Sequence, residues 1–293
     1  MKYIFFMGKG GVGKSTLSSL IAYKLAKRGE KTVLISLDFA HNLGDIFNMK
    51  IGNKGVRLEE HLDIFEPDID RWVEEYLRNT RVLIKENYKY VSVFNLDNML
   101  NLMKNSPGIE EYAILHLLYE KTKALADMDY LVVDMPPTAL ALRIFALPFI
   151  TREWLKTLLK LRKEILVKRK RIANVHGKEK FDFAVDEHED KVYRNLKEQE
   201  EENAFLLKLI QGANIIPVTL PVQLSFKETE RILKKLSEFK LNVPFVIVNR
   251  VKNDEWKKGC VCIEDKEVKT FDDFKREIKF QDFDNIDSEI LPL

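Results

Sequence analysis

Residues 8–16 read GKGGVGKST and match G-x-x-x-x-G-K-[ST], the pattern of a loop that binds nucleotide phosphates. Its glycines let backbone N–H groups fold around a polyphosphate, where side chains would block the approach. Lys14 is placed to reach the β- and γ-phosphates, and the Ser15 hydroxyl to ligate Mg²⁺. An apolar run before the loop and helical spacing over 15–28 predict a strand and a helix around it. The predicted ATP-binding residues are Gly8, Lys9, Gly10, Gly11, Val12, Gly13, Lys14, Ser15 and Thr16.

A second lysine, Lys9, follows the first glycine of this loop. An ordinary phosphate loop needs only Lys14, so Lys9 is either a solvated surface cation or a group with a use of its own. A lysine on the rim of the loop can reach the phosphates of a facing subunit and stabilise the charge that develops during transfer, as an arginine finger does. We therefore expect a homodimer in which Lys9 takes part in catalysis.

Short apolar runs alternate with helical segments and predict the strands of a parallel sheet. They cover residues 3–7, 31–38, 62–66, 130–134, 215–219 and 245–249. This alternation is typical of an α/β protein with a doubly wound, mostly parallel sheet. Helical stretches at about 68–125 and 151–210 predict an inserted helical subdomain within a single domain spanning 1–293. Asp38 and Asp134 end two of the strands, so both acids are expected beside the phosphate loop.

Bulk composition excludes several classes of protein. With 48 basic and 46 acidic residues the net charge is close to zero, so no nucleic-acid partner is expected. The sequence nowhere holds the ~18 consecutive apolar residues of a transmembrane helix. Two cysteines argue against a secreted disulfide scaffold, and the first apolar run is too short for a secretory signal. A cytoplasmic protein is expected.

Several segments resemble one family, the arsenite-pump and tail-anchored-protein-targeting ATPases. The phosphate loop has the form K-G-G-x-G-K-[ST], which is a deviant Walker A motif. Residues 38–45 (DFAHNLGD) resemble the family's switch I, usually DPAHNLSD, and residues 134–143 (DMPPTALALR) its switch II, usually DTAPTGHTLR. Further resemblances, in the same order as in the family, lie at 106–111 (SPGIEE), 226–231 (FKETER) and 248–250 (VNR).

The resemblance implies roles for individual side chains. Asp38 would orient the water that attacks the γ-phosphate, and with Lys9 it completes the predicted catalytic pair. Asp134 would hold Mg²⁺ through water, while Ser15 ligates it directly. Asn249 offers an amide to the adenine edge. For the two acids the alternative interpretation is a helix cap or a surface turn.

The chain departs from the family pattern in switch II. Ala139 stands where the family usually has glycine and Leu140 where it has histidine. Both changes alter the turn that approaches the γ-phosphate, so slow ATP hydrolysis is expected. Val222 follows Pro221 where the family often has an acidic residue near the nucleotide, and that contact is not carried over.

The two cysteines, Cys260 and Cys262, lie where the targeting branch has a C-x-x-C motif that shares one zinc ion across the dimer. Their C-x-C spacing leaves two interpretations open. Two chains would supply four thiolates to a tetrahedral Zn²⁺, or the pair consists of inert reduced thiols. The pump branch binds arsenite with three thiols, and this chain has no third cysteine.

The preferred function is a Mg²⁺-dependent ATPase whose nucleotide state makes a homodimer bind or release a hydrophobic client, such as a tail-anchored membrane protein. Apolar helix faces fit a client surface but are equally typical of a packed core. These faces are at 96–118 (with Met99 and Met103) and at Leu155, Leu158, Leu159, Leu161, Ile165 and Leu166. The alternatives are an arsenite-pump ATPase subunit, a spatial-organising ATPase of the partition or septum-positioning type, and a metabolic transferase on the same fold.

Overall fold

The computed structural model describes residues 1–39, 42–87, 106, 108–177, 180–181, 183–252, 266–273 and 278–286. These residues form an eight-stranded sheet in the order β3-β4-β2-β5-β1-β6-β7-β8. Neighbouring strands are parallel except for β3, which pairs antiparallel with β4. The strands are β1 (Lys2–Met7), β2 (Thr32–Ser36), β3 (Val56–Glu59), β4 (Leu62–Phe65), β5 (Tyr130–Asp134), β6 (Asn214–Thr219), β7 (Phe245–Val251) and β8 (Glu267–Asp272). The predicted α/β class with a doubly wound, mostly parallel sheet is confirmed.

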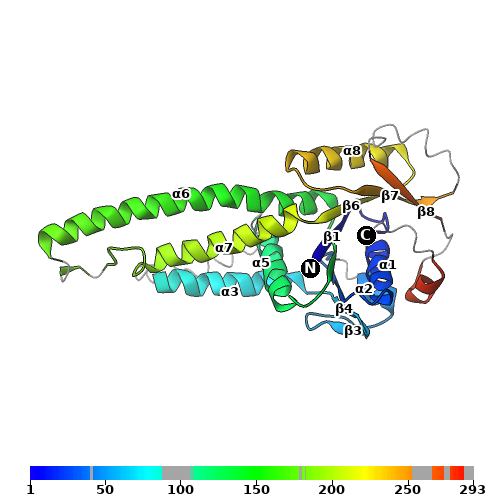
Figure 1. Cartoon of the computed structure of the whole chain (residues 1–293), viewed down its shortest axis with the longest axis horizontal. Helices are drawn as coiled ribbons and strands as arrows, with labels where there is room; N and C mark the ends of the chain where they lie inside the picture. The colour runs from blue at the N-terminus through cyan, green and yellow to red at the C-terminus, as the bar shows by residue number, and fades with distance from the viewer. Residues whose placement is uncertain are drawn as a thin grey trace.

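Helices cover both faces of the sheet (Figure 1). Successive side chains of a strand point to opposite faces, so Phe5 and Phe6 of β1 enter different core clusters. Helices α1 and α2 and the 3-10 helix η5 pack on the Phe6 side, and α3 and α5–α8 contribute to the Phe5 side. The helices are α1 (Lys14–Lys27), α2 (Asn42–Phe47), α3 (Ile69–Asn87), α5 (Ile109–Ala124), α6 (Thr138–His176), α7 (Lys191–Gln211), α8 (Gln223–Glu238) and η5 (Phe280–Asn285).

Helix α6 differs most from the sequence prediction. It begins at Thr138 and continues through Pro148 to His176, whereas the sequence predicts helix only from about residue 151. Proline removes one intrahelical hydrogen bond, which ends most helices. Here Pro148 is buried, and its carbonyl accepts a hydrogen bond of 3.0 Å from Asn203 Nδ2 on α7. Tertiary packing therefore carries the helix past its proline.

Two strands that the sequence does not predict lie at the edges of the sheet. β3 is half-buried or exposed along its length, and β8 buries only Phe271. An edge strand has little apolar surface to cover, so it carries no continuous apolar run. Among the described residues, no helix has the length and apolarity needed to cross a membrane.

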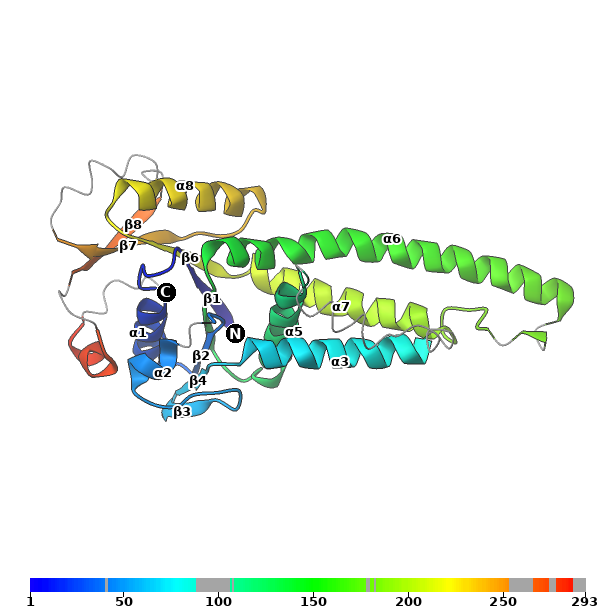
Figure 2. The same cartoon turned by 180° about the vertical axis from the view of Figure 1, so that it is seen from behind.

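Helices α3, α6 and α7 extend beyond the sheet to one side as a long arm (Figures 1 and 2). Leu155, Leu159 and Leu166 of α6 are buried, and the latter two pack with Tyr193 of α7, so the packed-core interpretation holds for them. Other apolar side chains of α6 recur at intervals that place them on one exposed face. This α6 apolar stripe consists of Ile150, Trp154, Leu158, Leu161, Ile172 and Val175.

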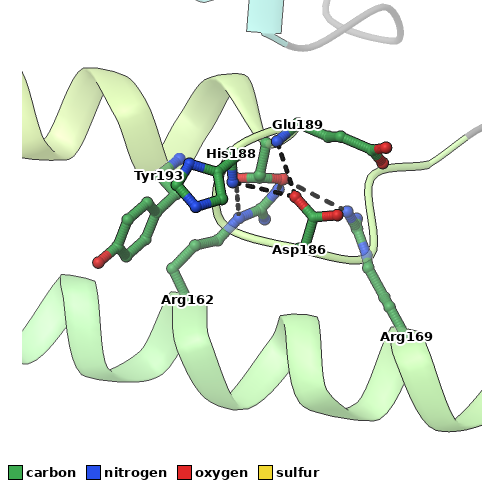
Figure 3. Close-up of polar contacts among 7 residues, drawn as sticks. Arg162, Arg169, Asp186, His188, Glu189 and Tyr193 are labelled. Atoms are coloured by element: carbon green, nitrogen blue, oxygen red, sulfur yellow. Dashed lines mark hydrogen bonds and ion pairs between the residues drawn. The ribbon is translucent and has the colours of Figure 1, made fainter.

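The outer part of the arm is held by a buried carboxylate, Asp190, between α6 and α7. Figure 3 shows Arg162 and Arg169, which point from α6 toward the segment that leads into Tyr193 of α7. The Asp190 oxygens accept two hydrogen bonds from Arg162, of 2.9 and 2.6 Å, and one of 2.7 Å from the N–H of Tyr193. Arg169 lies 3.8 Å away. Burial alone would raise the pKa of Asp190, but the hydrogen bond from Arg162 and the other donors bring it below its ordinary value. Asp190 therefore both caps α7 and ties it to α6.

We expect Asp190→Asn to loosen this helix hairpin. The amide keeps a cap for Tyr193 but leaves the charge of Arg162, only 16% exposed, without its anion. Breaking a buried pair costs about 3–5 kcal/mol. Hydrogen exchange at the start of α7 should accelerate while exchange in the sheet is unchanged. Glu198→Gln, an exposed position on α7, is the matched control, and equal exchange in both variants would contradict the role of Asp190.

Candidate functional site

The loop between β1 and α1 has glycines where a side chain does not fit. Gly11 and Gly13 have φ values of 79° and 96°, in the left-handed region that favours glycine. A Cβ atom at Gly8 would collide with the carbonyl oxygen of Val218, and one at Gly13 with the amide of Asn249. Gly13 is also the N-cap of α1, whose N-terminus favours an anion. The local geometry is that of the predicted phosphate loop.

Lys14 lies where the loop, β2 and β5 meet. Its side chain is 4% exposed, and Nζ donates to the carbonyl of Lys9 at 3.4 Å and lies 3.8 Å from Asp38 Oδ2. Both contacts are longer than a charge-assisted hydrogen bond of about 2.8 Å. Phosphate oxygens would therefore compete well for the ammonium group. The structure thus brings together Lys14 and Asp38, as the sequence predicts.

Asp134 is fully buried at the end of β5. Its Oδ2 accepts a 3.3 Å hydrogen bond from Ser36 Oγ, and its Oδ1 has no hydrogen-bond partner among the residues that the structure describes. Burial raises the pKa of Asp134 to about 6, an effect that the Ser15 hydroxyl and Lys14 partly offset and that Asp38 increases. An unpartnered carboxylate oxygen beside a serine hydroxyl is a donor set that Mg²⁺ accepts. Ser15 and Asp134 therefore fit the predicted magnesium site.

We expect Asp134→Asn to stabilise the metal-free protein at pH 8. The raised pKa means that the folded state disfavours ionised Asp134, a cost of about 3 kcal/mol that is fully present above about pH 6. As the pH falls below about 6 the carboxyl of the folded protein takes up a proton, so the cost shrinks, and it is gone only below the ordinary pKa of 3.8. Urea unfolding in EDTA at pH 8 and pH 5 measures the difference. An equal effect at both pH values, or a destabilised variant at pH 8, would contradict this.

Lys9 lies on the rim of the loop and is paired within its own chain. Its Nζ is 3.5 Å from Oε2 of Glu228 on α8, and the two side chains are 55% and 32% exposed. A pair this exposed contributes at most about 1 kcal/mol, so Lys9 can leave Glu228 at little cost. The predicted contact with a second subunit stays a prediction.

Asn249 supports the phosphate loop. Its Nδ2 donates to the carbonyl of Val12 at 2.8 Å, and its Oδ1 accepts from the N–H of Arg250 at 2.9 Å. The side chain is 7% exposed and lies against Gly13. Loop support is a role that the sequence did not indicate, and the predicted contact with adenine stays a prediction.

Switch II leads directly into α6. Leu140 packs partly buried against the core, and its N–H bonds the carbonyl of Pro137 at 3.0 Å. Arg143 forms a 2.8 Å ion pair with Glu111, which is 4% exposed at the start of α5. This ion pair joins two of the segments that carry the family resemblance, switch II at 134–143 and the segment at 106–111. With Ala139 and Leu140 in this turn, slow hydrolysis remains the expectation.

The structure does not describe every predicted residue. Cys260 and Cys262 lie outside the described residues, as do Met99 and Met103. The described part of the chain holds no group of three or more potential metal-binding His, Cys, Asp or Glu side chains, and the zinc interpretation has no support from it. Thr16 lines a separate polar cavity of about 930 Å³ beside α2.

Sequence reasoning missed two polar residues of the site. Ser36 bonds Asp134 and accepts a 3.4 Å hydrogen bond from the N–H of Asp38. Glu66 follows β4 and is 6% exposed. An acid at the end of a predicted parallel strand is the signal that singled out Asp38 and Asp134, and it applies equally to Glu66.

Comparison with known proteins agrees with the family resemblance predicted from the sequence. Over residues 1–293 the chain matches the family described as anion-transporting ATPase. A protein of Aquifex aeolicus (strain VF5) named as an arsenical pump-driving ATPase is 29% identical over 285 residues, which cover 95% of this chain and 91% of that protein. ATPase ASNA1 homolog 2 of Paramecium tetraurelia is 29% identical over 253 residues, covering 86% of this chain and 76% of that protein.

Site and comparisons agree on the chemistry. The phosphate loop, Lys14 and Asp134 lie together at the carboxyl ends of parallel strands, where they would fit a nucleotide, and the family consists of ATPases. The predicted family resemblance and the predicted ATP hydrolase are both confirmed, and the family implies a bound nucleotide together with Mg²⁺. The chain belongs to the family of anion-transporting ATPases.

Proposed function

We propose that this ATPase works as a nucleotide-switched homodimer that holds a hydrophobic client, such as a tail-anchored membrane protein, in one nucleotide state and releases it in the other. The observation that carries the proposal is the course of α6. This helix begins at Thr138, four residues after Asp134 at the end of β5, and runs without interruption to His176 in the arm. A movement of switch II on loss of the γ-phosphate would therefore displace the arm.

Each site residue has a part in the proposed reaction. Lys14 contacts the β- and γ-phosphates, and Asp38 orients the attacking water. Mg²⁺, held by Ser15 directly and by Asp134 through water, would neutralise charge on the phosphates. Asn249 supports the loop and offers its edge to adenine. One ATPase domain spans residues 1–293, with the helical subdomain formed by the segments at about 68–125 and 151–210.

The mouth of the site supports a dimer. Lys9 is exposed on the rim of the loop, and exposed apolar side chains lie next to Asp38 on switch I and at the start of α8, the helix that carries Glu228. These are Phe39, Val222 and Leu224, with exposed fractions of 40%, 52% and 70%. Apolar groups beside a charged rim are what a closing subunit would bury. The second copy would then place its Lys9 on the phosphates of the first.

The α6 apolar stripe supports a hydrophobic client. Trp154 is 64% exposed and Leu161 is 53% exposed on a helix that projects away from the sheet (Figure 2). An amphipathic client helix would cover such a stripe with its own apolar face. The proposed protein works in the cytoplasm and binds no nucleic acid.

Co-purification tests the client. The full-length protein is co-expressed with a tail-anchored protein and isolated with Mg²⁺ and a non-hydrolysable ATP analogue or with ADP. We expect capture in the analogue state only. The double variant Trp154→Asp, Leu161→Asp should lose at least ~10-fold, because a carboxylate in an apolar contact is costly. Val82→Asp, at a 49% exposed position on α3, is the matched control.

Three results would contradict the client. Equal capture with ADP and with the analogue would show that the nucleotide does not control client binding. Full capture by the stripe variant would show that the α6 apolar stripe is not the client surface. The client-free protein could instead bind lipid vesicles through the α6 apolar stripe and capture no client. That result would show that the stripe is a membrane-binding surface. Arsenite-stimulated hydrolysis would favour the pump alternative, which the name of the Aquifex relative supports and the count of two cysteines does not.

A further inference from the structure

Glu66 lies at the carboxyl end of β4 and contacts switch I. Its side chain is 6% exposed, and Oε1 accepts a 2.8 Å hydrogen bond from the N–H of Leu43, in the first turn of α2. We infer that Glu66 is a positioning residue for ATP hydrolysis: it anchors the far end of the segment that carries Asp38. The inference rests on the role of Asp38 in the proposed function.

The geometry explains why a carboxylate is needed there. The first N–H groups of a helix have no partners within the helix, and the six-residue α2 is too short to be stable alone. Its position therefore depends on tertiary contacts, which are the core packing of Leu43 and Phe47 and the hydrogen bond from Leu43 to Glu66. A Cβ atom at Gly44 would lie 3.5 Å from Glu66 Oε2, so the second oxygen also lies close to α2. Glu66 thus fixes α2 relative to β4.

The other end of the segment is fixed as well. The N–H of Asp38 donates to Ser36 Oγ, and that hydroxyl donates to the buried carboxylate of Asp134. Asp38 is therefore held between the metal-binding carboxylate on one side and the Glu66 anchor on the other. If the anchor is lost, α2 can shift and carry Asp38 with it. Misplacement of a catalytic group by 1 Å can cost about 100-fold in rate.

Steady-state ATPase kinetics of five variants, including Asp38→Asn alone, test the inference. We expect Glu66→Ala to lower kcat by roughly 10- to 100-fold with little change in KM for ATP. Glu66→Gln should recover most of the lost kcat, because its amide oxygen can accept from the Leu43 N–H. The double variant Glu66→Ala, Asp38→Asn should have nearly the same kcat as Asp38→Asn alone. Glu66 acts through Asp38, so its loss has no further effect once Asp38 is replaced. Glu60→Ala, an exposed acid between β3 and β4, is the control.

The outcomes separate this inference from the proposed function. If Asp38→Asn retains hydrolysis, the proposed role of Asp38 fails whatever Glu66 does. If Asp38→Asn is inactive but Glu66→Ala keeps its kcat, only the Glu66 inference is overturned. It is also overturned if the two losses multiply in the double variant, or if a folded Glu66→Gln is as slow as Glu66→Ala. Urea unfolding of each variant shows whether the fold is intact.

Discussion

Lys9→Met is expected to lower the ATPase rate by about 1,000-fold, the effect of removing a cation supplied in trans. The variant keeps Lys14, so it should still bind ATP at its own loop. The methionine side chain fits the exposed position 9. Losing the ion pair with Glu228 changes the free energy of unfolding by less than about 1 kcal/mol. Dimerisation with a non-hydrolysable ATP analogue, measured by light scattering, should weaken together with the rate.

The matched control for this prediction is Lys234→Met. Lys234 is exposed on α8, the helix that carries Glu228. The Lys234→Met substitution removes one positive charge from the same surface and leaves the phosphate loop unchanged. Wild-type hydrolysis by Lys9→Met would show that Lys9 is a solvated cation. A loss of the same size in Lys234→Met would show that the surface charge, and not Lys9 itself, is what matters.

Asp38→Asn is expected to lower kcat by about 100- to 10,000-fold, because an amide cannot act as the acceptor that orients the attacking water. Nucleotide binding should persist, since Lys14 and the loop backbone are intact. Removing a negative charge 3.8 Å from Lys14 should, if anything, tighten the affinity for ATP. The variant would then accumulate as the triphosphate-bound dimer. Quench-flow separates the chemical step from binding.

Asp45→Asn is the control for Asp38. Asp45 is an exposed acid of α2, a short distance along the same segment. It should hydrolyse ATP at the wild-type rate. A normal single-turnover rate in Asp38→Asn would assign Asp38 to the structure of switch I and leave the reaction without its proposed water-orienting group.

The phosphate loop and its sheet could be predicted because local rules and tertiary packing agree there. The glycines are required by contacts with Val218 and Asn249, and a motif records such a requirement directly. The strand at 130–134 matches the structure in both bounds, because a buried parallel strand is apolar along its whole length. Asp38 and Asp134 follow from the rule that parallel strands end at one edge.

Other features depend on contacts between distant residues. Around the buried Pro148, α6 packs against α7 through Asn203, which lies far along the chain. Leu159 and Leu161 look alike in sequence, yet only Leu159 is buried, because its side faces α7. The pairing of Lys9 with Glu228 likewise joins two exposed charges that no local pattern connects.

The central claim, that Lys9 acts on the nucleotide of a second subunit, is tested most directly by mixing two inactive variants. A heterodimer of Lys9→Met and Asp38→Asn has one complete site: the Lys9→Met chain keeps its own Asp38 and receives Lys9 from its partner. An equal mixture that exchanges subunits freely should therefore recover roughly a quarter of the wild-type ATPase rate. If Lys9 served only its own chain, neither site would be complete. A mixture that exchanges subunits but hydrolyses no faster than its parts would contradict the account.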